Sequence, residues 1–273
     1  MARHESSDAP VPGDTAQDER ALAPDRRSRR YHRGLVSASE GCPMARMPRL
    51  AVGGQPHLVI QRGGPQPAFR DDTDRLAYVA ALRELARGHG VAVHAYALLD
   101  DAVLLLATPR DGPDLGRFMQ RVSRRYVPAF HQRHGGNGPL WAGRFQAAPL
   151  DPERYLLLGM LMVEQAPVRA GLAALAVDWP WSSARHHGGR AAVPWITEHE
   201  AWWRIGNTPF EREARHEIEL QGMLREEQVA ELLAAARGGW PIGAPAFVAA
   251  AAAEAAGRPA RPAPRGRPRR AAS

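Results

Sequence analysis

The sequence predicts an α+β fold that combines one antiparallel sheet with helices. Three observations carry this prediction. Short apolar runs are bounded by glycine and proline, longer runs place apolar residues at helical spacing, and the two kinds of run follow the order β-α-β-β-α-β. This order is typical of the ferredoxin-like, split-βαβ arrangement, with helices on one face of the sheet. A further helix and a helical C-terminal extension follow the last strand.

The bounds of the elements follow from helix caps and from glycine and proline stops. We expect Pro128 to bend or disturb the second long helix, because proline lacks a backbone N–H. The expected elements are a strand at 57–62, a helix from a cap at 71–73 to about 88, strands at 91–99 and 103–108, a helix from 113 or 114 to about 134, a strand at 141–150 and a helix from 151 to about 166.

The ends of the chain differ in composition from its centre. Residues 1–46 mix Ser, Asp, Pro, Gly and Arg without a period, so we expect disorder there. Met44-Ala45-Arg46 repeats the opening Met-Ala-Arg, and we expect translation to start at Met44. The expected organisation is a main domain at 47–190, a helical region at 191–256 and a disordered basic tail at 257–273. Within the helical region we expect Trp195, Trp202 and Trp203 to anchor short helices, followed by helical stretches at 211–236 and 246–256.

Composition limits the class of protein. The chain has 273 residues and a formal net charge of +7, and all 36 of its basic residues are arginine. A GC-rich genome explains the absence of lysine, but the net positive charge favours an acidic partner such as nucleic acid. The single cysteine excludes a disulfide framework, and no apolar run approaches the length of about 18 residues typical of a membrane span. We therefore expect a cytoplasmic protein with no membrane partner.

Several local blocks together carry a resemblance to a known protein family. The blocks are Met47–Leu50, His57–Gly63, Phe69–Arg75, His94–Leu99, Leu140–Phe145, Pro167–Leu172 and Trp179–Ser183. Over roughly residues 44–190 the chain thereby resembles the REP-associated tyrosine transposases, a bacterial branch of the single-tyrosine (HUH-type) transposases. Any one block is weak evidence, but their common order and spacing make the resemblance specific.

The resemblance implies a site for DNA strand cleavage and transfer. A tyrosine attacks a DNA phosphodiester, and Mg²⁺ or Mn²⁺, held by two histidines and an amide side chain, polarises the phosphate. In this sequence the histidine pair falls at Ala102 and Leu104, the tyrosine at Met162 and the amide at Ala166. None of these residues has the required chemistry. We therefore expect no catalytic residue, no metal ligand and no cofactor, and Mg²⁺ or Mn²⁺ only if the activity of the family were retained.

Substitute residues provide alternatives. Asp100 and Asp101 could bind a metal or form a hairpin turn, and Tyr126 could be a nucleophile or a packed helix residue; we favour the turn and the packed residue. The histidine pairs at 131 and 134 and at 186 and 187 lack further ligands, which favours solvent-exposed histidines.

The predicted DNA contacts are arginines that recur along the second long helix, occur in the family blocks or lie in the tail. A solvated charged surface remains an equal alternative for the arginines outside the tail. Residues 264–270 contain Arg-Gly-Arg-Pro, the core of an AT-hook that enters the minor groove, with a GC-coded tail as the alternative. The predicted contacts are Arg62, Arg117, Arg121, Arg124, Arg125, Arg144, Arg169, Arg265, Arg267 and Arg269.

These observations predict a DNA-binding protein of transposase lineage (DNA transposition and recombination) with a degenerate active site. The expected partner is hairpin or single-stranded DNA, including repetitive palindromic elements, in the nucleoid of a bacterium. The resemblance is compatible with a monomer or a homodimer. Two alternatives stay open: an active single-strand transposase that uses substitute residues, and a decayed gene product without function.

Overall fold

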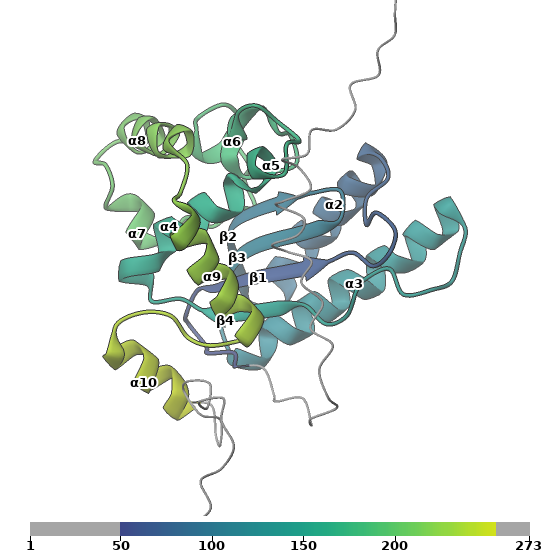
Figure 1. Ribbon diagram of the computed structural model, residues 1–273, viewed down its shortest axis with the longest axis horizontal. Helices are drawn as coiled ribbons and strands as arrows, with labels where there is room; N and C mark the ends of the chain where they lie inside the picture. Colours follow the sequence, from purple (N-terminus) through teal and green to yellow (C-terminus); the bar gives the residue numbers. More distant parts are fainter. Residues whose placement is uncertain (1–49, 255–273) are drawn as a thin grey trace, which may run out of the picture.

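The computed structural model describes residues 50–254, which form a four-stranded antiparallel sheet packed between helices (Figure 1). The predicted α+β class is confirmed. The sequence expectations for residues 1–46, the Met44 start and the AT-hook-like tail lie outside the described residues. None of the helices in the described range is long and apolar enough to cross a membrane.

The sheet has the strand order β2-β3-β1-β4. The hairpin pairs β2 with β3, β1 lies between β3 and β4, and every pairing is antiparallel. Strand β4 is shorter than the expected strand at 141–150, because residues 142–144 form an exposed loop before it. The strands are β1 (His57–Arg62), β2 (Val91–Leu98), β3 (Ala102–Pro109) and β4 (Gln146–Pro149).

Helices cover both faces of the sheet, so the expectation of helices on one face is wrong. Successive strand residues point to opposite faces, and both faces of β1 and β3 are apolar. Val59 and Leu105 belong to the cluster that α2 (Asp72–Gly88) and α3 (Gly112–His134) cover. Ile60 and Leu104 belong to the cluster that α4 (Pro152–Glu164) and α9 (Glu226–Gly238) cover. Figure 1 shows α9 in front of β1 and β4, with α2 and α3 behind the strands. The predicted C-terminal extension thus completes the second layer.

The helices begin at caps that the sequence provides. Asp71 caps α2 by accepting a hydrogen bond from the backbone N–H of Asp74 at 3.0 Å. Helix α3 continues through Pro128, which is exposed, as is Arg124, so water can satisfy the carbonyl that loses its hydrogen-bond partner. The long helices are α2 (Asp72–Gly88), α3 (Gly112–His134), α4 (Pro152–Glu164), α8 (Pro209–Gly222), α9 (Glu226–Gly238) and α10 (Pro245–Glu254).

Short helical turns connect α4 to α8. The helical stretch expected at 211–236 is divided into α8 and α9 at Met223, which has a φ of 48°. Of the three tryptophans expected to anchor this region, Trp202 is buried, Trp195 is half-buried and Trp203 is exposed. The short elements are α5 (Ala166–Arg169), the 3-10 helix η1 (Ala176–Asp178), α6 (Ala184–His187) and α7 (Glu200–Trp203).

Candidate functional site

The four positions that the resemblance assigns to metal and nucleophile lie in one buried cluster. Ala102 and Leu104 alternate on β3 and face α4, near whose C-terminal end Met162 lies; Ala166 begins α5. Their exposed fractions are 2% for Ala102 and 0% for the other three. Residues about 60 positions apart in the chain thus share one apolar core. None of these side chains carries an oxygen or a nitrogen, so the cluster has no strong ligand for Mg²⁺ and no nucleophile.

Tyr126 is held inside the protein as a structural residue. It is 2% exposed, and its hydroxyl donates a hydrogen bond of 2.6 Å to the carbonyl of Ala68. Its ring packs against Phe69 and Tyr78. Burial, with the nearby charge of Asp74, raises the pKa of the Tyr126 phenol far above its usual value. The phenolate that an attack on phosphorus requires is therefore strongly disfavoured, and the packed alternative is confirmed.

Asp100 and Asp101 form the turn between β2 and β3, as the favoured alternative predicts. The backbone N–H of Leu99 donates to the carbonyl of Ala102 across this turn at 2.8 Å. The carboxylate of Asp100 pairs with the guanidinium of Arg75. The backbone carbonyl of Asp101 accepts a hydrogen bond from Gly63. The turn thus connects the hairpin to α2 and to the end of β1.

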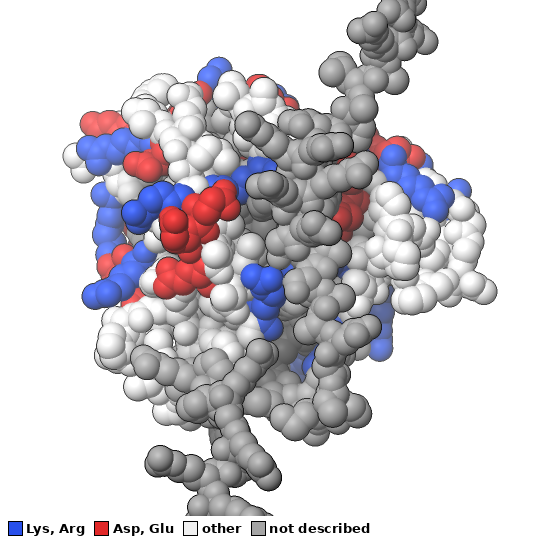
Figure 2. Space-filling view, viewed as in Figure 1, with Lys and Arg blue, Asp and Glu red and all other residues white. Residues whose placement is uncertain are grey.

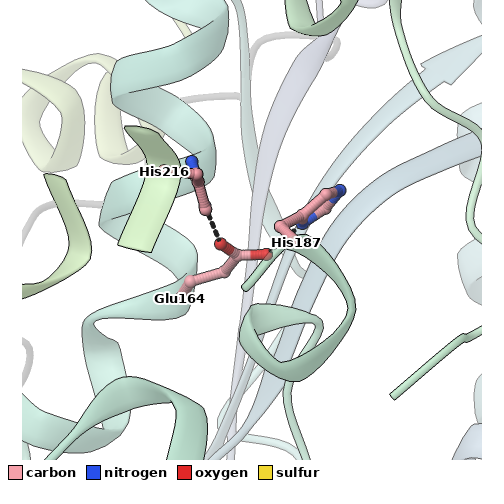
Figure 3. A group of neighbouring side chains, drawn as sticks. All are labelled: Glu164, His187 and His216. Carbon is pink, nitrogen blue, oxygen red and sulfur yellow. Dashed lines mark hydrogen bonds and ion pairs between the residues drawn. The ribbon is translucent and has the colours of Figure 1, made fainter. Parts of the chain in front are cut away.

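The most completely buried polar cluster joins Glu164, His187 and His216, which come from α4, α6 and α8 (Figure 3). One carboxylate oxygen of Glu164 accepts a hydrogen bond from Nδ1 of His187 and the other accepts from Nε2 of His216, each at 2.6 Å. The hydroxyl of Ser183 donates to the first oxygen. The Trp202 ring packs against both imidazoles, with ring centroids at 4.7 and 4.9 Å.

This cluster keeps Glu164 ionised. Burial by itself raises the pKa of this carboxyl, but the two imidazoles and their hydrogen bonds outweigh burial and hold its pKa well below the usual value. One carboxylate and two imidazoles form a ligand set that suits Zn²⁺. However, each imidazole already bonds to a separate oxygen, and an ion about 2 Å from its ligands would have to replace both hydrogen bonds. We therefore interpret the cluster as a connection between α4, α6 and α8.

A second acidic cluster lies at the start of α2. The buried carboxylate of Asp74 pairs with Arg133 and His134 at the end of α3 and accepts a hydrogen bond from the backbone N–H of Arg70 at 2.9 Å. Arg133 also pairs with Asp71, whose pKa is lowered to about 2, mainly by that hydrogen bond. Because these carboxylates already pair with side chains at the end of α3, we interpret this cluster as a connection between α2 and α3.

The expectation of solvent-exposed histidines is wrong. His187 is 1% exposed in the Glu164 cluster, and His131, His134 and His186 are half-buried, His134 through its pairing with Asp74. Sequence reasoning missed the Glu164 cluster, because Glu164, His187 and His216 lie 23 and 29 positions apart in the chain. One signal could have found it: Glu164 is a lone acid in the apolar run of α4, and a buried acid requires partners.

The predicted DNA-contacting arginines are placed in different ways. Arg121 and Arg124 are exposed on α3, and within residues 50–254 neither pairs with an acid; Arg144 is likewise exposed. Arg117 pairs with Asp114 at 3.3 Å but stays 66% exposed. Arg125 pairs with Glu84, and Arg169 pairs with Glu226 and with the carbonyl of Leu224. Arg62 is half-buried beside Ala102. The last three predicted contacts, Arg265, Arg267 and Arg269, lie outside the described residues.

Charge on the visible face of the C-terminal helices is mixed. Figure 2 shows acidic and basic side chains interleaved over α7, α8 and α9 rather than a continuous basic surface. The ion pairs of Arg204 with Glu153 and Glu200 are part of this pattern. These helices therefore offer no uniform basic surface on this face, in contrast to the exposed arginines of α3.

Comparison with known proteins gives structural similarity only. No family model matches the chain, and no curated protein matches it. A REP-associated tyrosine transposase bound to a REP hairpin is similar with 16% sequence identity and a TM-score of 0.47, over 58% of this chain and 93% of that chain. A candidate transposase from Deinococcus radiodurans R1 is similar with 22% identity and a TM-score of 0.30, over 43% of this chain and 92% of that chain.

Proposed function

We propose that this protein is a DNA-binding protein of transposase lineage that has lost the chemistry of strand cleavage. The observation that carries the proposal is the burial of Ala102, Leu104, Met162 and Ala166 in one apolar cluster. The sequence resemblance assigns these four positions to metal ligands and nucleophile, and they lie in one core although they come from separate elements. Apolar side chains there stabilise the fold at about 25 cal/mol per Å² of buried surface.

The DNA surface in this proposal is the exposed side of α3. Arg117, Arg121 and Arg124 recur at spacings of four and three residues, so they lie on one side of the helix over about 10 Å. The opposite side of α3 is apolar and packs on the sheet. Arg144 and the basic tail would add contacts, whereas the Arg169 side chain is only 6% exposed and bonds to Glu226 and to the carbonyl of Leu224, so we assign it a structural role. The proposed ligand is hairpin or single-stranded DNA, recognised mainly through its phosphates.

We expect the substitution of both Arg121 and Arg124 by glutamine to weaken binding of single-stranded DNA and to lower its salt dependence. Each lost phosphate contact reduces the slope of log K against log salt by about 0.7, so the slope should fall by about 1.4. Fluorescence anisotropy of a labelled oligonucleotide over a salt series measures both quantities. Arg154→Gln is the matched control, because Arg154 is exposed on α4 away from α3.

Removal of residues 257–273 provides a second arm of the same experiment. Loss of the tail should lower affinity, because its arginines add phosphate contacts. If neither the full chain nor the truncated chain binds DNA, the proposed function is wrong and a decayed gene product is the better interpretation. A double variant with unchanged affinity and slope would remove α3 from the DNA surface.

A further inference from the structure

A cavity opens at one end of the sheet, away from the cluster around Ala102. It has a volume of about 510 Å³ and lies between the end of α2, the start of β2, the end of β3 and residues 194–197. Backbone hydrogen bonds hold its walls: Arg110 N–H donates to the carbonyl of Gly90 at 2.7 Å, and Thr197 N–H donates to the carbonyl of Val93 at 2.9 Å. The cavity is a wide depression open to solvent, and its volume is within the range of about 300–1,000 Å³ of small-ligand sites.

The charged side chains that line this cavity are both cationic. They are Arg87, in the last turn of α2, and Arg110, directly after β3, and no acidic residue among residues 50–254 lines the cavity. The nearest acid to Arg110 within the described residues is Asp111, at 3.6 Å, and both side chains are at least 70% exposed. Such an exposed pair contributes little, so the Arg110 guanidinium is available to an anion. Arg87 is exposed and forms no ion pair within the described residues, so its guanidinium is available too.

Gly90 leaves room for the Arg110 side chain. Gly90 has a φ of +62°, and a Cβ atom at this position would come within 3.3–3.5 Å of the Arg110 side chain. The Arg110 side chain therefore lies directly over the glycine backbone at the mouth of the cavity. Glycine both permits the left-handed backbone of this turn and leaves room for the arginine above it.

An aromatic wall completes the cavity. Trp195 lines it and also packs against Tyr96, with ring centroids 5.1 Å apart and planes tilted by 34°. This contact fixes the indole, so that its remaining surface is presented to the cavity together with apolar atoms of Val91 and Ile196. A fixed indole in the same cavity as two arginines matches the needs of a nucleotide, whose base stacks on an aromatic ring while its phosphate meets guanidinium groups.

We propose that this cavity binds one nucleotide of a single-stranded DNA segment, with its base on Trp195 and its phosphate on Arg87 and Arg110. The inference rests on the proposed function and adds a specific position for the unpaired strand. It lies at the opposite end of β3 from Ala102, so strand capture here is independent of the lost cleavage chemistry.

The test is anisotropy of a labelled oligodeoxythymidine with the full chain and two cavity variants, Trp195→Leu and Arg87→Gln/Arg110→Gln. Loss of one stacked base should weaken binding about tenfold or more, and the arginine variant should weaken it and reduce its salt dependence. Trp203→Leu and Arg83→Gln are the controls, since Trp203 and Arg83 are exposed outside the cavity, and they should bind as the wild type does.

Three outcomes would overturn the inference or the function beneath it. If the wild type binds DNA and both cavity variants bind equally well, the cavity is not the nucleotide site, while the proposed function stands. If the wild type binds neither hairpin nor single-stranded DNA, the proposed function itself fails. If thymidine monophosphate competes as well as the oligonucleotide, the cavity is a site for free nucleotides. The arginine variant decides the result should Trp195→Leu unfold, because both arginine side chains are exposed.

Discussion

Replacing Glu164 by alanine is expected to destabilise the protein by about 3–5 kcal/mol, because it leaves His187, His216 and Ser183 buried without their shared acceptor. Typical domains have an unfolding free energy of about 5–15 kcal/mol, so this one change removes a large part of it. Glu164→Gln keeps the shape but places an amide N–H₂ opposite an imidazole donor, and it should also destabilise. Urea unfolding followed by circular dichroism measures both effects.

The matched control is Glu153→Ala on the same helix. Glu153 also pairs with a cation, Arg204 at 2.7 Å, but both side chains are more than half exposed. We expect little change in stability, because water replaces an exposed ion pair at almost no cost. Equal stability of the Glu164 and Glu153 variants would contradict the structural interpretation of the buried cluster.

Chelation distinguishes two interpretations of the Glu164 cluster, a hydrogen-bonded connection and a metal site. A hydrogen-bonded cluster predicts that dialysis against a chelator leaves the melting temperature unchanged. Stoichiometric zinc in the purified protein, with a melting temperature that falls on chelation, would show instead that the two imidazoles and the carboxylate bind an ion.

Stability should fall steeply as the pH is lowered from about 6.5 to 4, because two buried histidines are held neutral. Burial, only partly offset by a hydrogen bond to a backbone carbonyl, lowers the pKa of both His57 and His94 to about 4. Nδ1 of His57 donates to the carbonyl of Gln55, and its Nε2 accepts from the backbone N–H of Val52. Nδ1 of His94 likewise donates to the carbonyl of Thr197, while its Nε2 accepts from the Thr108 hydroxyl. Protonation would destroy the acceptor in each case.

The sign and size of this pH effect follow from proton linkage. Between pH 6.5 and 4 the unfolded chain binds a proton at each site and the folded chain does not, so acid favours unfolding. The stabilising contribution of the two neutral histidines is complete above pH 6.5 and is lost by about pH 4. Each pH unit corresponds to about 1.4 kcal/mol, so a pKa lowered from 6.5 to about 4 corresponds to about 3 kcal/mol for each histidine. The two histidines begin to lose their stabilising contribution at a higher pH than Glu164 does. The contribution of Glu164 falls only below the usual carboxyl pKa of about 4.3.

Urea unfolding at pH 7, 5.5 and 4.5 measures the pH effect. His94→Gln should flatten the pH dependence, because the amide can donate and accept but does not titrate. His89→Gln is the control, since His89 is a half-exposed residue at the end of α2, and its variant should keep the wild-type slope. A wild-type protein whose unfolding free energy is constant over this range would contradict the neutral, buried placement of His57 and His94.

The strands, the helices and their order could be predicted from the sequence, because they depend on local residue patterns. Apolar runs ended by Gly63 and Pro109, and caps such as Asp71, located the strands and helices of the β-α-β-β-α-β order to within a few residues, except for β4, which is shorter than expected. The second helical layer was not predicted, because the apolar sides of α4 and α9 do not reveal which face of the sheet they cover. The contacts of Glu164 with His187 and His216, and of Trp195 with Tyr96, join residues far apart in the chain. Only the folded structure brings them together.

One assay tests directly whether this protein binds DNA without cleaving it. Labelled hairpin DNA with a single-stranded flank is incubated with the full chain and Mg²⁺ or Mn²⁺, then resolved on native and denaturing gels. We expect a salt-sensitive shift on the native gel, with intact DNA and no covalent protein–DNA product on the denaturing gel. A covalent product, above all one that Tyr126→Phe abolishes, would show that strand cleavage survives and would contradict the proposed function.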